Sequence, residues 1–323
     1  MKLSATLIEA GPETVHWGYL SAGITPVARI ASGETVTMTS VSGLPDVVAG
    51  SPYPAAPALL AIHKSLMKRT IPGHICTGPV AVAGARPGDV LQVDIESVDL
   101  DSDWAYTGVR PLAGALPHDF DERHMTYIEI DRTRAVAKLP WDMEIPLRPF
   151  FGVICVAPPA EWGELSTVPP RRNGGNIDNR ELVKGTTLFL PVFVEEALFS
   201  AGDGHGVQGD GEICTAAVEM GMRGTFRLTV RHDMKLTWPI AETPTHFITM
   251  AFDPDLDDCV VIAVRQMIDL LVGQTGLSRV EAYKLLSYVG DLRVTQVVNG
   301  NKGIHLMVDR TYFRGRSLRT VQA

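Results

Sequence analysis

Short segments of alternating apolar and polar residues, separated by glycine and proline, fill most of the chain as far as residue 231. Residues 90–98 alternate in this way directly after a turn at residues 86–89, and residues 33–39 repeat the design after a glycine. A period of two predicts strands with one face towards solvent. Further strands are expected at residues 26–30, 34–40, 187–190 and 224–231. Helical periodicity is scarce here, so this part is predicted to be mainly β.

The sequence changes character from Asp257 onwards. Residues 259–272 form a long, uninterrupted apolar run that ends at Gly273, which predicts a buried helix. Ser278 and Glu281 match a capping box, with Ser at the N-cap and Glu at N3, and predict the start of a second helix. Two closing strands are expected at residues 292–298 and 303–308.

These patterns predict a mainly β protein with a β-sandwich or barrel-like core. With 323 residues, 45% of them apolar, the chain is long enough to bury a substantial core. We assign residues 1–231 to the mainly β domain, which carries the candidate site. Residues 232–323 are assigned to a smaller α+β portion with the helical pair and the closing strands.

Charge and composition exclude several classes of partner. The net charge is −8, and no long run of one sign occurs, so the chain lacks the basic surface that binds nucleic acid. A membrane span requires about eighteen consecutive apolar residues, and the sequence contains no such stretch. Residues 1–10 lack the pattern of a secretory signal, so we expect a cytoplasmic protein. Four widely separated cysteines without a CxxC pair are expected to be reduced thiols: Cys76, Cys155, Cys214 and Cys259.

The densest polar cluster is the glycine-rich segment 202–212, Gly-Asp-Gly-His-Gly-Val-Gln-Gly-Asp-Gly-Glu. Glycine at this density costs backbone entropy, so it indicates positive φ angles or close backbone approach. The carboxylates and the imidazole between the glycines are metal ligands or proton carriers. A single Asp-Gly pair is usually only a turn. Two such pairs, with His205 between them and Glu212 directly after, favour a loop that binds a metal.

A second polar cluster, Asn-Gly-Gly-Asn-Ile-Asp at residues 173–178, precedes this segment by one predicted strand. A strand of about eight residues spans roughly 26 Å. Asp178 can therefore reach the same ion only if the chain doubles back between Val194 and Gly202, which makes it a weaker candidate. His74 and His16 are each more typical of structural histidines, although together with His205 they could complete a zinc site.

Five segments together resemble the ordered signature of the acetamidase/formamidase family. They are His-Trp-Gly-Tyr at 16–19, Gly-His-Ile-Cys-Thr-Gly-Pro at 73–79, Gly-Gly-Asn-Ile-Asp at 174–178, the segment 202–212, and Asp-Leu-Arg-Val-Thr-Gln-Val-Val-Asn at 291–299. The resemblance runs from about residue 15 to 310. Segment 202–212 fills every fixed position of the family pattern GDxHxxQGDGE. Residues 214–219 depart from the family, which would have Gly after the Cys and Ile before the Glu.

The resemblance implies a mostly β enzyme that contains zinc or calcium and hydrolyses short carboxamides to the acid and ammonia. It also implies a homodimer or a larger homo-oligomer. An amide resists attack because its nitrogen donates into the carbonyl, and a divalent metal helps by lowering the pKa of the water that it binds. We hypothesise that Asp203 and His205 bind the metal with help from Asp178 or His74. Zinc suits such a set best, and calcium suits one dominated by oxygen.

Glu212 is the candidate general acid and base, which takes the proton of water and passes it to the departing ammonia. Glu219, expected on the adjoining strand, is the alternative. Asp210 is either a further metal ligand or the residue that orients His205. Two amide side chains are candidates for binding the substrate: Asn176 and Gln208.

Other functions remain open from the sequence. A non-catalytic β module stabilised by calcium would use the same oxygen-rich segment, although His205 argues against it because calcium prefers oxygen. A cupin-like iron oxygenase would require His74 and His205 on one metal. Serine chemistry is disfavoured because no Gly-x-Ser-x-Gly elbow occurs. Cys214 is a possible nucleophile, although a small buried thiol is the commoner explanation.

Overall fold

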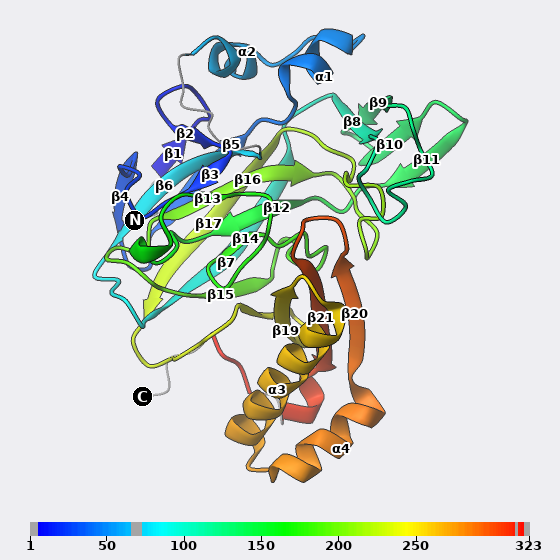
Figure 1. Cartoon of the computed structure of the whole chain (residues 1–323). Helices are drawn as coiled ribbons and strands as arrows, with labels where there is room; N and C mark the ends of the chain where they lie inside the picture. Colours follow the sequence, from blue (N-terminus) through cyan, green and yellow to red (C-terminus); the bar gives the residue numbers. More distant parts are fainter. Residues whose placement is uncertain (1–5, 66–72, 314–315, 320–323) are drawn as a thin grey trace.

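A computed structural model describes residues 6–65, 73–313 and 316–319. Its largest element is a nine-stranded sheet (Figure 1). In spatial order the strands are β1 (Thr6–Ile8), β5 (Thr35–Ser40), β17 (Met222–Arg231), β7 (Val90–Leu100), β15 (Thr187–Pro191), β18 (Ile240–Glu242), β19 (His246–Asp253), β21 (Lys302–Asp309) and β20 (Asp291–Gln296). The strands predicted at 34–40, 90–98, 187–190 and 224–231 all belong to this sheet.

A six-stranded sheet packs against it. Its strands are β14 (Gly174–Asn176), β12 (Phe150–Cys155), β16 (Phe199–His205), β6 (Ile75–Ala83) and β2 (Val15–Trp17), with β4 (Ala28–Ala31) paired to β6. Two smaller sheets complete the β structure of the described residues. One contains β11 (Met143–Pro146), β10 (Val136–Leu139), β9 (His124–Asp131) and β8 (Trp104–Val109), and the other pairs β13 (Leu165–Ser166) with β3 (Tyr19–Leu20).

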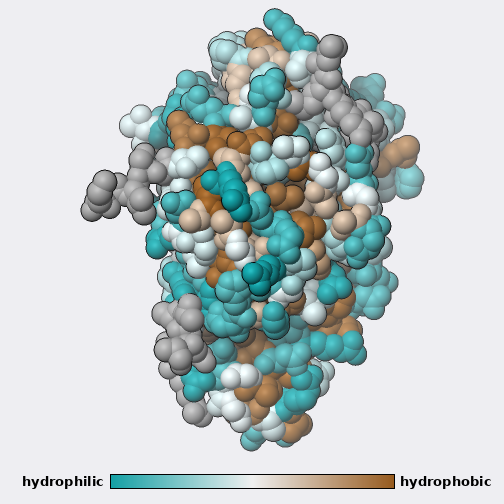
Figure 2. Space-filling view, turned by 90° about the vertical axis from the view of Figure 1, so that its left-hand side faces the viewer, coloured by the Kyte–Doolittle hydropathy of each residue, from teal (hydrophilic) through white to brown (hydrophobic). Residues whose placement is uncertain are grey.

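The main core lies between the two large sheets. Phe226 of β17 contacts Phe151 of β12 and Phe199 of β16 edge to face, with ring centroids 5.4 and 5.5 Å apart. Such pairs add specific geometry to the burial of large apolar surfaces. The prediction of a mainly β protein is therefore confirmed. The face shown in Figure 2 mixes hydrophobic with hydrophilic residues, as is usual for a folded protein surface.

The helical pair forms as predicted, with one correction. Helix α3 (Leu256–Thr275) packs its buried side on β19 and β21, and α4 (Arg279–Val289) begins with the Ser278–Glu281 capping box. The prediction that the first helix ends at Gly273 is wrong. A single glycine inside a helix costs only about 1 kcal/mol, whereas Gly276, at φ 77°, adopts the left-handed conformation that ends helices.

The nine-stranded sheet crosses the predicted boundary between residues 231 and 232. Leu188 of β15 pairs with Val93 of β7 on one side and with Ala241 of β18 on the other. Continuous backbone hydrogen bonding thus joins the two portions, and the division into domains stays a prediction.

The remaining helices are short. Helices α1 (Pro45–Gly50) and α2 (Pro57–Lys64) each begin with proline, a favoured first helical residue, and the sequence patterns did not predict them. Two 3-10 helices lie at Ala160–Trp162 and Arg310–Phe313. Among the described residues, no helix is both long and apolar enough to cross a bilayer. Residues 1–5, on which part of the signal-sequence expectation rests, lie outside the described residues.

Candidate functional site

The first four residues of segment 202–212 form a buried strand. Gly202, Asp203, Gly204 and His205 end β16, between β12 and β6, so the prediction of a loop is wrong for these four residues. The glycines explain how the core accepts it. A Cβ on Gly202 would collide with the Ile75 carbonyl, and one on Gly204 would collide with Met220 and Met222. Close backbone approach is thus the use of these glycines.

Asp178 reaches the same place because the chain doubles back after β15. Three consecutive residues, Glu196, Ala197 and Leu198, have φ angles of 61°, 60° and 58°, which turn the chain back towards β16. As a result, Asp178 Oδ1 lies 3.9 Å from His205 Nδ1. The chain therefore doubles back between Val194 and Gly202, as it must for Asp178 to lie near His205.

Both candidate glutamates approach the same imidazole. The backbone of Glu219 forms an isolated antiparallel β-bridge with that of His205, and Glu219 Oε1 lies 3.3 Å from His205 Nε2. Asp203 Oδ2 lies 3.2 Å from the same nitrogen. Potential ligand atoms of His205, Glu212 and Glu219 lie within 4.8 Å of one another, as do those of Asp178, Asp203 and His205. The side chains come from distant parts of the sequence but converge on one histidine.

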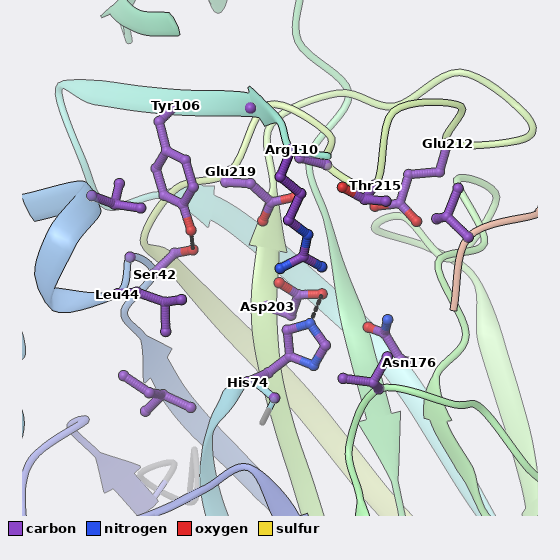
Figure 3. Close-up of a pocket in the computed structure, with 18 of the residues that line it drawn as sticks. Ser42, Leu44, His74, Tyr106, Arg110, Asn176, Asp203, Glu212, Thr215 and Glu219 are labelled. Atoms are coloured by element: carbon purple, nitrogen blue, oxygen red, sulfur yellow. Dashed lines mark hydrogen bonds and ion pairs between the residues drawn. The ribbon is translucent and has the colours of Figure 1, made fainter. Parts of the chain in front are cut away.

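His74, the residue directly before β6, lies beside this cluster. Its Nε2 lies 3.7 Å from Asp203 Oδ2, and its Nδ1 lies 3.2 Å from the Thr167 hydroxyl. Figure 3 shows the His74–Asp203 pair in the middle of the pocket. His16, in contrast, is buried and contacts the Tyr19 carbonyl and Ser200.

The proton on His205 can be placed from its neighbours. Gln208 Nε2 donates to the Asp178 carbonyl at 2.7 Å, so its Oε1 is the atom that accepts from His205 Nδ1–H at 2.9 Å. This leaves His205 Nε2 facing the carboxylates of Asp203 and Glu219 without a hydrogen bond of good geometry. Three acceptor atoms at such short distances require either a proton or a cation among them.

Several buried polar atoms at the site have no hydrogen-bond partner among the described residues. They are Asn176 Oδ1, Asp178 Oδ1, His205 Nε2 and Glu212 Oε2. Buried polar groups are nearly always paired, so a cluster of exceptions indicates a bound group. One imidazole nitrogen with several carboxylate oxygens is a donor set that suits zinc. The residues present therefore fit a divalent metal.

Burial raises the pKa values of three carboxyl groups. It raises the pKa of Glu212 well above its ordinary value, with a further contribution from the charge of Asp178. Burial also raises the pKa of Glu219 above its ordinary value and that of Asp178 to about 6. The direction follows from the cost of holding a charge away from water.

The His205–Asp203 pair shifts in the opposite sense. Burial alone would raise the pKa of Asp203, but the charges of His74 and His205 hold it below its ordinary value. Burial would also lower the pKa of His205, yet Glu219 and Asp203 raise it well above its ordinary value. The two carboxylates thus favour positive charge beside the imidazole, which a bound metal cation would supply.

A glycine leaves room beneath the cluster. A Cβ on Gly152 of β12 would lie 2.5 Å from Asp178 Oδ1, 2.6 Å from Asp203 Oδ2 and 2.9 Å from His205 Cε1. Real Cβ atoms do not approach other atoms so closely. Only glycine at this position lets the three side chains meet.

A pocket of about 250 Å³ opens above the cluster. Its lining includes His74, Asn176, Asp203, Glu212 and Glu219 (Figure 3). The candidate catalytic glutamates and the candidate substrate-binding Asn176 therefore share one cavity.

Two predicted site residues lie elsewhere. Asp210 is exposed and does not belong to either group of converging ligand atoms in the described chain. The side chain that contacts His205 Nδ1 is Gln208, not Asp210. Gln208 is buried behind the imidazole and is not among the described residues that line the pocket. Once the chain leaves β16, neighbouring residues of the motif point in different directions.

Sequence reasoning missed several residues of the pocket. Asn299, in the turn before β21, donates from Nδ2 to Asp178 Oδ2 at 2.5 Å. It ends the last of the five matching segments, which was the one available signal. Ser42 and Tyr106, hydrogen-bonded to each other at 3.0 Å, and Arg110 line the pocket from segments without any polar motif.

The four cysteines are free, as expected. Cys76, Cys155 and Cys259 are buried, and Cys214 is partly exposed. The Cys214 thiol is directed to the Ala216 carbonyl at 3.5 Å. Cys214 is not among the described residues that line the pocket, which places it outside the candidate chemistry.

Comparison with known sequences gives consistent matches. A model of the Acetamidase/Formamidase family matches residues 24–164 and 159–307. An acetamidase from Mycolicibacterium smegmatis is 30% identical over 217 residues, which cover 46% of this chain and 52% of that protein. A formamidase from Methylophilus methylotrophus is 31% identical over 199 residues, with 46% and 49% covered. The matches thus span about half the length of these curated relatives.

Comparison with solved structures covers nearly the whole chain. The crystal structure of an acetamidase from Bacillus halodurans superposes with a TM-score of 0.83 at 30% identity, covering 95% of this chain and 99% of that one. A predicted acetamidase/formamidase from Thermoanaerobacter tengcongensis gives a TM-score of 0.85 at 25% identity, covering 98% and 100%. Sequence and fold lead to the same result: the chain belongs to the acetamidase/formamidase family.

Proposed function

We propose that this protein hydrolyses small aliphatic carboxamides to the carboxylate and ammonia with the help of a divalent metal. The observation that carries the proposal is the group of unpartnered buried acceptor atoms around His205, below a pocket lined by two glutamates. Membership of the acetamidase/formamidase family supports an amide as the substrate.

Asp203, His205 and Glu219 would hold the metal. Asp203 Oδ2 lies 3.2 Å from His205 Nε2, and Glu219 Oε1 lies 3.3 Å from the same nitrogen. Asp178 or His74 would complete the set. When bound, the metal supplies Lewis acidity, which makes water a better nucleophile and polarises the amide carbonyl. Zinc is the preferred candidate because the set includes an imidazole, and calcium is the alternative.

Glu212 is placed to move the proton. It lines the pocket, and its buried Oε2 has no partner among the described residues. It would accept a proton from the attacking water and deliver it to the leaving nitrogen. Asn176 Oδ1, also unpartnered, would accept a hydrogen bond from the amide N–H. Gln208 orients the imidazole by accepting its Nδ1–H.

The experiment is ammonia release from formamide, acetamide and propionamide, measured before and after chelation and after addition of zinc or calcium. We expect chelation to abolish the activity and one of the metals to restore it. Full activity in protein shown by elemental analysis to be free of metal would disprove the metal dependence. A metal-loaded protein that releases ammonia from none of these amides would disprove the hydrolysis, and would favour the non-catalytic calcium module.

One observation favours a second candidate. Nε2 of His74 and Nε2 of His205 lie 3.7 and 3.2 Å from the same oxygen of Asp203. Two histidines and a carboxylate are also the donor set of iron oxygenases. Oxygen consumption by the iron-loaded protein would favour this function, whereas amide turnover without oxygen uptake would exclude it.

Two further expectations belong to this proposal. The protein is expected to act in the cytoplasm and to form a homodimer or a larger homo-oligomer. Light scattering of the purified chain would test the second expectation, because a monomer at all concentrations would contradict it.

A further inference from the structure

The pocket is larger than the smallest amides require. Its volume is about 250 Å³. Acetamide has four non-hydrogen atoms, and at about 30 Å³ for each, the share of one molecule in liquid water, it would occupy roughly 120 Å³. About half of the pocket therefore remains for further atoms of a substrate.

One side of the pocket combines an apolar cluster with two hydrogen-bonded polar side chains, Ser42 and Tyr106 (Figure 3). In Figure 3, Glu212, Thr215 and Asn176 lie on one side of the His74–Asp203 pair. Leu44 lies on the other side. Leu44 belongs to an apolar cluster whose members that line the pocket are here called the apolar wall: Trp17, Val41, Leu44 and Ile75.

The apolar wall is held in place by its packing. Trp17, Val41 and Ile75 are only 5%, 9% and 6% exposed, because the rest of each side chain is packed in the cluster. The Trp17 ring also stacks on His63 with centroids 5.5 Å apart. A wall fixed in this way presents the same surface to every ligand, so little entropy is lost when a ligand binds.

We propose that the apolar wall binds an unbranched acyl chain of about four to six carbon atoms, a size that follows from the free volume at about 30 Å³ for each carbon. The preferred substrates would then be medium-chain carboxamides, not formamide or acetamide. This inference rests on the proposed amide hydrolysis. The amide group lies towards Glu212 and Asn176, and the chain lies along Leu44.

Water against an apolar wall is displaced favourably by methylene groups. Each buried methylene improves binding by about fourfold. Acetamide offers a single methyl group, so it leaves most of the wall in contact with water. Longer chains gain until the free volume is filled.

The test is kcat/KM for the unbranched amides from formamide to octanamide, measured by ammonia release from the metal-loaded full chain. We expect a rise of about fourfold for each methylene up to about hexanamide, mostly through KM, and then a plateau or a fall. A maximum at formamide or acetamide overturns the inference and leaves the hydrolysis intact. Failure to hydrolyse any of these amides overturns both.

A variant locates the effect on the wall. Leu44→Trp fills the free volume and is expected to lower the ratio of hexanamide to acetamide kcat/KM at least tenfold. The matched control is Leu7→Trp on β1, where Leu7 is 52% exposed and not part of the pocket lining; it is expected to leave the ratio unchanged. An unchanged ratio in Leu44→Trp overturns the inference. If that variant fails to fold, the chain-length series on the parent protein still decides.

Discussion

Buried carboxylates in this protein are stabilised in two different ways. Glu242 of β18 is fully buried, accepts hydrogen bonds from Ser317 Oγ and Leu318 N, each at 2.7 Å, and lies 3.1 Å from Arg310. At the pocket, Asp178, Asp203, Glu212 and Glu219 gather around a single imidazole. Both oxygens of Glu242 accept a hydrogen bond, whereas Asp178 Oδ1 and Glu212 Oε2 have no partner among the described residues.

The difference shows how a structural carboxylate can be distinguished from a functional one. Burying an unpaired charge is costly, and a chain that only needed stability would pair or remove it. At Glu242 the cost is offset by an arginine and two hydrogen bonds. At Glu212 it is not offset by the described residues, which implies that a metal or a substrate completes the site.

Removal of a site carboxylate should affect catalysis more than folding. In Glu212→Gln we expect kcat to fall by about 10²–10⁴-fold, the usual contribution of a general acid or base. The free energy of unfolding should stay within about 1 kcal/mol of the parent, because Glu212 Oε2 has no partner among the described residues to lose. Amide hydrolysis and urea unfolding measure the two effects. Glu195→Gln, at an exposed glutamate, is the matched control; equal activity in both variants would refute the assignment.

The space beneath the cluster gives the second prediction. Gly152→Ala places a Cβ against Asp178, Asp203 and His205, so both metal content and activity should fall at least tenfold, with about 1–3 kcal/mol of stability lost to overpacking. Metal analysis, ammonia release and thermal unfolding would show it. Gly273→Ala in α3, where a Cβ meets nothing within 4 Å, should instead be neutral or slightly stabilising. Normal metal content in Gly152→Ala would contradict this account of the site.

The paired carboxylate should behave in the reverse way. Glu242→Gln leaves Arg310 without its charged partner, and we expect a loss of about 3 kcal/mol in the free energy of unfolding. The kcat of the folded protein should not change. Chemical denaturation and amide turnover, compared with Glu212→Gln, would sharpen the contrast. If Glu212→Gln were the less stable of the two variants, the distinction between the groups would fail.

A buried histidine outside the site gives the smallest effect near neutral pH. Burial lowers the pKa of His16 from its ordinary value of 6.5 to about 4, so only the unfolded chain binds a proton between these values. Stability is therefore lost as the pH falls from about 6.5 to 4, by up to about 3 kcal/mol. Urea unfolding across this range, compared with His16→Gln, tests it. An equal pH dependence in both proteins would rule out His16 as the cause.

The sequence predicts local structure well where periodicity carries the signal. The alternation at residues 90–98 and the apolar run at 259–272 correspond to β7 and α3. The end of α3 was misplaced because Gly273 and Gly276 are both plausible, and only the backbone conformation distinguishes them. Periodicity does not predict short helices such as α1, because six residues make less than two helical turns.

The site was only partly predictable for a physical reason. Asp203, His205 and Glu212 stand in one motif, and Asp178 in another, so residue type and spacing were enough to nominate them. Whether a side chain points inward depends on the strand that carries it and on its neighbours. Asp210 is as good a ligand by type as Asp203, but it follows the end of β16 and faces solvent. Asn299 reaches Asp178 through tertiary structure alone.

The glycines of β16 also determine which parts of this protein can diversify. A Cβ atom on Gly202 or Gly204 would overlap atoms of a neighbouring part of the chain. Substitutions of these two glycines would therefore displace whole strands. Ser42 and Leu44 instead already carry side chains that line the pocket, whereas Gly43 between them has a φ angle of 116°, which favours glycine. Directed evolution towards new amides should therefore recover its improved clones from libraries of Ser42 and Leu44, while libraries of the strand yield mostly misfolded protein.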